Sequence, residues 1–187
     1  MNLPNKLTML RILLIPVFMV FIEWDSLPGH ILWAFVIFVA ASLTDFVDGY
    51  IARKNNMVTD FGKFMDPLAD KILVTAALVY FIPLGLAPAW VVILILAREF
   101  LVTSLRLIAA GKGIVIAADI FGKMKTVSQM IWVATTIVQM YLEEELLIGI
   151  PLLAEMNIVL MWVTLGLTVV SGINYLWKNR AVLSDMK

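Results

Sequence analysis

The chain has 187 residues, of which 62% are hydrophobic and 15% are charged, and its mean hydropathy is +0.97. An ordinary soluble domain is only about half apolar, so this composition indicates a membrane protein. The 14 Lys and Arg residues balance the 14 Asp and Glu residues, which excludes a polybasic nucleic-acid binder, and the lack of cysteine excludes disulfides, thiolate zinc sites and cysteine nucleophiles. We expect no removable signal peptide, because residues 1–10 contain no small-residue cleavage site.

Six apolar stretches are long enough to be membrane-spanning helices. They cover residues 7–22, 31–52, 67–84, 88–110, 120–142 and 154–177. Spans of about 20 residues leave only short loops, so any chemistry must be carried by the helices themselves. We therefore expect an all-α, polytopic membrane protein with a single domain over residues 1–187. Its N-terminal segment is expected to start along the membrane interface, because Asn5, Thr8 and Arg11 recur on one side of the first helix.

The distribution of charge predicts the orientation of the spans. If six spans alternate, all 14 basic residues lie on one side of the membrane, and the other side receives Glu23, Asp25, His30, Glu155 and the run 143–145. The positive-inside rule then places both termini and the basic connections in the cytoplasm, with the protein in the cell membrane. The acidic run 143–145 is expected to be a solvated outer loop.

Four carboxylates meet where the second span ends and the third begins. Asp45 and Asp48 are spaced i, i+3, and Asp66 and Asp70 are spaced i, i+4, so each pair lies on one face of a helix with Cβ atoms about 5–6 Å apart. A solvated helix end accounts well for one such Asp. Four at these spacings indicate a site at the cytoplasmic end of a helix hairpin.

This acidic cluster needs positive compensation, because a charge within a span costs about 2.5–3.5 kcal/mol, and less near the interface. Arg53, Lys54 and Lys71 stand at its edges and are one candidate. A divalent cation is the better one. Oxygen ligands, with no cysteine and with His30 on the opposite side, favour Mg²⁺ or Mn²⁺ over Zn²⁺, and two such ions sharing carboxylates would suit transfer of a phosphoryl group.

Gly49 and Ala52 remove bulk from one strip of the helix beside these acids. Two interpretations fit this strip. A planar substrate group could lie there, or another helix could pack closely against it.

The acidic segment forms a longer pattern. It reads Asp45-x-x-Asp48-Gly49-x-x-Ala52-Arg53, and after eight further residues Gly62-x-x-x-Asp66-x-x-x-Asp70. All eight fixed positions match the signature of the CDP-alcohol phosphatidyltransferase family, which the chain also resembles in length and number of spans. Three further segments are similar to its bacterial phosphatidylglycerophosphate synthase branch. They are Pro4-Asn5-x-Leu7-Thr8-x-x-Arg11, Arg98-Glu99-Phe100-x-x-Thr103-x-x-Arg106 and Gly122-Lys123-x-Lys125-Thr126.

The resemblance implies a metal-dependent enzyme that transfers a phosphatidyl group from CDP-diacylglycerol to sn-glycerol 3-phosphate and releases CMP. Relatives that share the acidic signature use phosphatidylglycerol, inositol phosphate, serine or choline instead, so the acceptor is less certain than the reaction. Homodimerisation is implied by the resemblance alone. A cation-coupled transporter is the main alternative, but the acids lie at one end rather than at the midplane and no inverted repeat is present.

The resemblance also implies roles for particular residues. The metal ligands would be Asp45, Asp48, Asp66 and Asp70, and Asp70 is in addition the candidate base for the acceptor hydroxyl. Contacts to CDP-diacylglycerol would come from Asn5, Thr8, Arg11, Asp48, Gly49, Ala52, Arg53 and Gly62. For Asn5, Thr8 and Arg11, an interfacial anchor is an equally good interpretation.

The acceptor phosphate needs cations that the acidic cluster does not supply. Arg98, Arg106, Lys123 and Lys125 are the candidates. Arg98 and Arg106 are about two helical turns apart and share a face, and arginine binds phosphate in a bidentate manner. The alternative is that these residues are ordinary positive-inside anchors, and Glu99 beside Arg98 also allows a structural network.

Overall fold

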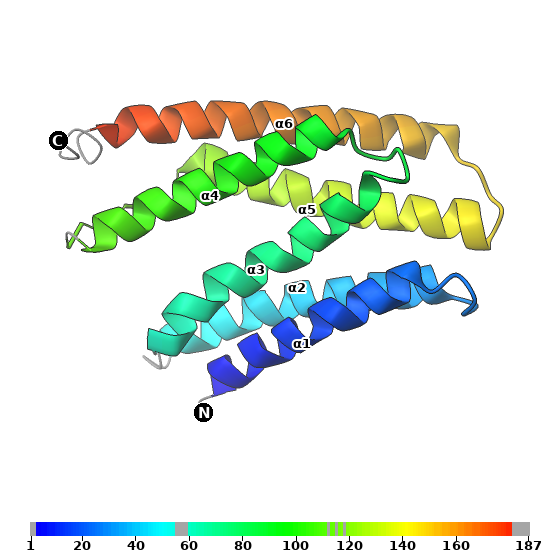
Figure 1. Ribbon diagram of the computed structural model, residues 1–187, viewed down its shortest axis with the longest axis horizontal. Coiled ribbons are helices and arrows are strands. Elements are labelled where there is room, and N and C mark those ends of the chain that lie inside the picture. The colour runs from blue at the N-terminus through cyan, green and yellow to red at the C-terminus, as the bar shows by residue number, and fades with distance from the viewer. Residues whose placement is uncertain (1–2, 55–59, 112, 115, 118, 181–187) are drawn as a thin grey trace. The chain divides into compact units, whose positions relative to one another are not determined.

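The computed structural model describes residues 3–54, 60–111, 113–114, 116–117 and 119–180, and side chains within this part except at 3–4, 45–54, 60–64, 66–68 and 70. Over this part all of the regular secondary structure is helical and no strand is present, as predicted (Figure 1). Its helices are α1 (Leu3–Glu23), α2 (His30–Lys54), α3 (Asp60–Phe81), α4 (Ala89–Gly111), α5 (Ile120–Met140), the π-helical η1 (Tyr141–Glu145) and α6 (Pro151–Lys178).

These helices coincide with the six predicted apolar stretches except at the start of the third. Helix α3 begins at Asp60, about two turns before Pro67, whereas the sequence places the helix start at residue 67. A proline lacks one backbone N–H, and a helix can continue through it with the loss of a single ladder hydrogen bond and a local distortion. Both Asp66 and Asp70 therefore lie inside a helix.

Two of the helices in the described part are long and apolar enough to cross a membrane, namely residues 5–23 of α1 and all of α6. His30–Thr44 and Lys71–Phe81 are shorter apolar helices. Helix α4 carries Arg98, Glu99 and Arg106 along its length. Six membrane spans stay a prediction, since apolar length alone distinguishes only two of them.

The chain divides into two compact units, and the first combines residues 1–80 with 133–154. In it α1 packs along α2. The Phe18 and Phe38 rings lie 6.0 Å apart and are almost fully buried. Tyr80 of α3 donates its hydroxyl hydrogen to the Ile22 carbonyl oxygen at 2.9 Å. Aromatic packing and this hydrogen bond thus hold α1 to the two helices that follow it, α2 and α3.

The acidic run 143–145 has more structure than a solvated loop. Glu143 and Glu144 are exposed, but Glu145 accepts a hydrogen bond at 2.8 Å from the backbone N–H of Ile31. It also lies 4.0 Å from Nε2 of His30. The first N–H groups of a helix have no partner within the helix and attract an anion. For Glu145 the expectation of a solvated loop is therefore wrong, because this residue caps α2.

The second unit combines residues 81–132 with 155–187, and it contains α4, the first half of α5 and most of α6. Val102, Leu105 and Ala109 of α4 form a buried cluster with Tyr175 of α6. Thr164 of α6 donates its hydroxyl hydrogen to the Ser128 hydroxyl of α5 at 3.1 Å. Helix α6 therefore contacts both α4 and α5. A single domain over the whole chain stays a prediction.

Candidate functional site

The backbone confirms that both acid pairs are helical. Asp45 and Asp48 lie in the last turns of α2, and Asp66 and Asp70 lie in the first half of α3. Their predicted spacings therefore place each pair on one helix face. The side chains of all four are outside the described part, as are those of Gly49, Ala52, Arg53 and Gly62. Elsewhere in the described part no group of three or more His, Asp or Glu residues could hold a metal ion.

Three polar residues of α1 are buried in the first unit. Asn5, Thr8 and Arg11 are 8%, 1% and 1% exposed. Arg11 donates from Nε to the Ala41 carbonyl oxygen of α2 at 3.3 Å, one helical turn before Asp45. A helix face that anchored the chain at the membrane surface would keep its polar groups among headgroups and water. The burial argues against an interfacial anchor, and the contact of this face with CDP-diacylglycerol stays a prediction.

Arg98 is half-buried among three helices of the second unit. Its Nε donates to the Ser171 hydroxyl of α6 at 3.1 Å, and Nη1 lies 3.9 Å from Oε1 of Glu99. A Cβ atom at Gly122 would lie only 3.1 Å from Nη2, and one at Gly172 only 3.3 Å from Cγ. Glycines on α5 and α6 thus leave the space that this side chain occupies.

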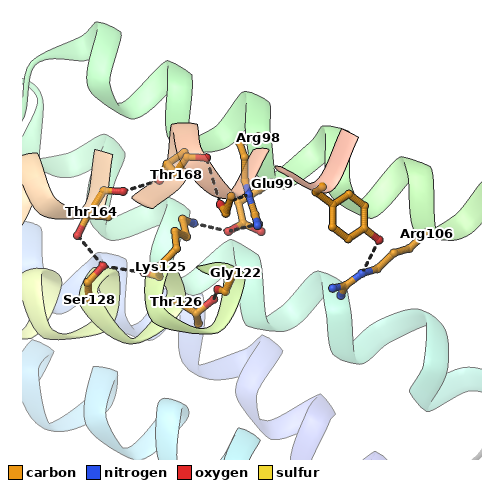
Figure 2. Close-up of polar contacts among 11 residues, drawn as sticks. Arg98, Glu99, Arg106, Gly122, Lys125, Thr126, Ser128, Thr164 and Thr168 are labelled. Atoms are coloured by element: carbon orange, nitrogen blue, oxygen red, sulfur yellow. Dashed lines mark hydrogen bonds and ion pairs between the residues drawn. The ribbon is translucent and has the colours of Figure 1, made fainter. Parts of the chain in front are cut away.

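Lys125 is completely buried and pairs with Glu99 across α5 and α4, as Figure 2 shows. The network continues from the Lys125 carbonyl, which accepts a hydrogen bond from the Ser128 hydroxyl at 3.0 Å. Lys123, two residues earlier, is exposed. The two lysines thus differ in environment, since Glu99 balances the charge of one of them. Together Arg98, Glu99 and Lys125 still carry one net positive charge.

Arg106 is exposed, as Lys123 is. Its Nε donates to the hydroxyl oxygen of Tyr175 at 3.1 Å (Figure 2), and its guanidinium carbon lies 5.5 Å from the centre of that ring. Tyr175 and Ser171 are one turn apart on α6. Arg98 and Arg106 therefore both contact α6, as expected for residues that share a face of α4.

The sequence matches one known protein family over most of its length. The family model for CDP-alcohol phosphatidyltransferase matches residues 1–170. This chain belongs to the CDP-alcohol phosphatidyltransferase family. The match includes both acid pairs and all four candidate phosphate-binding residues, so the resemblance inferred from the acidic signature is confirmed.

Several members of this family are similar to the chain over nearly its whole length. A CDP-diacylglycerol--glycerol-3-phosphate 3-phosphatidyltransferase of Bacillus subtilis is 48% identical over 189 residues, which cover 95% of each chain. A protein of the same name from Rickettsia bellii is 39% identical and covers 93% of each chain. Another from Wigglesworthia glossinidia brevipalpis is 34% identical over 70% of this chain and 74% of its own.

The structure adds residues of α6 that the family signature does not include. Ser171 and Tyr175, the partners of the two arginines, lie beyond residue 170, where the family match ends. One signal in the sequence could have found them. Ser171, Asn174, Tyr175 and Lys178 recur at helical spacing near the end of an otherwise apolar segment, which is the pattern of a polar helix face.

Asp119, which precedes α5, is a further residue with polar partners that lies outside the sequence motifs. It accepts hydrogen bonds from Asn174 and from the backbone N–H of Ile120, and Lys178 lies 3.5 Å away. Burial raises the pKa of Asp119, but the Asn174 hydrogen bond, the Lys178 charge and the Ile120 N–H outweigh it, so the pKa lies below its ordinary value. An ionised Asp119 therefore joins the start of α5 to the end of α6.

Proposed function

We propose that this protein transfers the phosphatidyl group of CDP-diacylglycerol to sn-glycerol 3-phosphate, giving phosphatidylglycerophosphate and CMP. The observation that carries the proposal is the 48% identity to a CDP-diacylglycerol--glycerol-3-phosphate 3-phosphatidyltransferase over 95% of both chains. The buried and half-buried cations of α4 and α5 support it, because a phosphorylated acceptor brings a dianion that needs positive partners.

The four aspartates would hold the divalent ions on which members of the family in general depend. The residues fit this role. Asp45 and Asp48 on α2 and Asp66 and Asp70 on α3 offer only carboxylate oxygens on helical backbone at spacings that align each pair, the donor set that Mg²⁺ or Mn²⁺ prefers. When bound, two such ions would neutralise the charge that develops on the pyrophosphate as CMP leaves.

In this mechanism the primary hydroxyl of the acceptor attacks the phosphorus that bears diacylglycerol. The new bond is between that hydroxyl oxygen and phosphorus, and the bond that breaks joins the same phosphorus to the oxygen that leaves with CMP. Asp70 accepts the hydroxyl proton as the new bond forms. A single in-line step of this kind inverts the configuration at phosphorus.

In the proposal each substrate is bound by its own set of residues. CDP-diacylglycerol is bound by Asn5, Thr8, Arg11, Asp48, Gly49, Ala52, Arg53 and Gly62. The acceptor phosphate is bound by Arg98, Arg106, Lys123 and Lys125. Burial of the α1 residues and the ties of both arginines to α6 support these assignments, because side chains fixed in advance bind with less loss of rotamer freedom.

The proposed setting is the cell membrane, with six spans, both termini and the reacting groups on the cytoplasmic side, and a homodimer as the assembly. The one-sided distribution of Lys and Arg supports the sidedness. The apolar helices α1 and α6 support the membrane location.

CMP release tests the function directly. Purified protein in detergent is incubated with CDP-diacylglycerol, Mg²⁺ and one acceptor at a time from a panel of sn-glycerol 3-phosphate, phosphatidylglycerol, serine and inositol phosphate. We expect rapid CMP release with glycerol 3-phosphate only, and none with excess EDTA. Release with a different acceptor would move the protein to another branch of the family, and no release with any of them would contradict the enzyme assignment.

A further inference from the structure

Tyr175 and Arg106 form a contact to which the proposed reaction assigns no role. The two residues differ sharply in environment, since Tyr175 is 2% exposed whereas Arg106 is exposed. The hydroxyl of the buried phenol accepts the hydrogen bond from Nε of Arg106. The bond uses Nε of the guanidinium, so the N–H donors of the two Nη groups take no part in it.

The position of the phenol is fixed by helix packing. Its ring is buried against Val102, Leu105 and Ala109, which belong to the turns of α4 on either side of Arg106. The ring therefore keeps its place relative to the backbone that carries the arginine. A hydrogen bond to such a fixed hydroxyl, with the ring face 5.5 Å from the guanidinium carbon at its centre, restricts the rotation of a long side chain that would otherwise sample many rotamers.

We propose that Tyr175 is a positioning residue for the acceptor, which acts by holding the guanidinium of Arg106 with its Nη groups directed at the phosphate of glycerol 3-phosphate. This inference rests on the proposed function. Bidentate binding of a phosphate requires the plane and the direction of the guanidinium to be correct. An arginine oriented before the substrate arrives binds more tightly than one that must be ordered on binding.

The second arginine supports a shared device on α6. Arg98 and Arg106 are two turns apart on α4, yet their partners Ser171 and Tyr175 are a single turn apart on α6. Both arginine side chains are therefore drawn toward the same short stretch of α6. In this proposal, Ser171 and Tyr175 of α6 orient the two arginines toward one acceptor phosphate.

The test is Tyr175→Phe, which removes the hydroxyl and keeps the buried ring. We expect KM for glycerol 3-phosphate to rise about three- to tenfold, the effect of losing one hydrogen bond, with kcat and KM for CDP-diacylglycerol within about twofold of the wild type. Tyr80→Phe is the matched control, because it removes a hydroxyl that bonds a carbonyl in the first unit. That variant should leave KM for glycerol 3-phosphate unchanged.

A double-variant cycle separates positioning from a general loss of structure. Arg106→Lys keeps the charge but has no Nε to bond the hydroxyl, so Tyr175→Phe should have no further effect on KM in that background. An unchanged KM in Tyr175→Phe, an equal rise in both backgrounds, or an equal rise in KM for both substrates would overturn the proposal. If the wild type itself releases no CMP with glycerol 3-phosphate, the proposed function fails instead.

Discussion

The aspartates of α2 and α3 are expected to be necessary for turnover but not for folding. Close carboxylates repel one another, so an amide at one of these positions relieves repulsion in the absence of metal. We therefore expect Asp45→Asn and Asp66→Asn to elute from size exclusion in detergent as the wild type does, yet to release no CMP. The measurement is turnover against Mg²⁺ concentration. Near-normal turnover of either variant at limiting metal would disprove the ligand assignment.

Asp70 is predicted to have a different role from Asp45 and Asp66, because it accepts a proton during the reaction. As a proton acceptor it is needed in the step that forms the bond to phosphorus, so Asp70→Asn should bind CDP-diacylglycerol nearly normally and lose less metal affinity than Asp66→Asn, while losing most of kcat. Metal titration of the three variants makes the comparison. A loss of metal affinity as large as that of Asp66→Asn, or retention of configuration with a chiral phosphorothioate substrate, would argue against this role.

Arg106 provides the third test at this scale. Arg106→Ala removes a charged hydrogen bond, worth about 1.5–3 kcal/mol, so KM for glycerol 3-phosphate should rise about ten- to a hundredfold. The apparent KM for CDP-diacylglycerol should change far less. Initial rates with each substrate varied in turn give both constants, and equal changes in the two would point to a structural role for this arginine.

Helices α4 and α5 are joined by a buried ion pair that we expect to stabilise the fold, in addition to the phosphate-binding role proposed for Lys125. Glu99 balances the charge of Lys125, which is fully buried. Removing one partner of a buried pair is strongly destabilising, by about 3 kcal/mol or more. We expect Glu99→Gln to unfold in detergent at a clearly lower temperature than the wild type. Glu155→Gln, which changes an exposed carboxylate of α6, is the matched control and should unfold as the wild type does.

At the scale of elements, the sequence predicts the helices well and their partners poorly. Apolar length and helical spacing are local properties, so the bounds of five helices and the alignment of each acid pair could be inferred from them. The start of α3 differs because residues 60–66 are helical but too polar to belong to the apolar stretch that begins at residue 67. The contacts of Arg98 with Ser171, of Lys125 with Glu99 and of Glu145 with Ile31 join residues far apart in sequence. Such contacts depend on how the helices pack, and local patterns in the sequence do not reveal that packing.

At the scale of the whole molecule, the lack of cysteine makes the predicted topology easy to test. Leu147 and Arg180 are both exposed, and the topology places them on opposite sides of the membrane. In intact cells a membrane-impermeant maleimide should label Leu147→Cys, whereas Arg180→Cys should react only after permeabilisation. Labelling of Arg180→Cys in intact cells would contradict the cytoplasmic C-terminus.

The cap on α2 has a consequence for biosynthesis. The backbone N–H of Ile31 donates to the carboxylate of Glu145. The cap of the second helix therefore depends on a residue that is translated 114 residues later. The first unit likewise needs residues 133–154, which are translated after α4 and most of α5. A nascent chain halted before residue 133 would contain α1 to α3 with that N–H still lacking its acceptor. Assembly of the first unit must therefore finish after synthesis of much of the second.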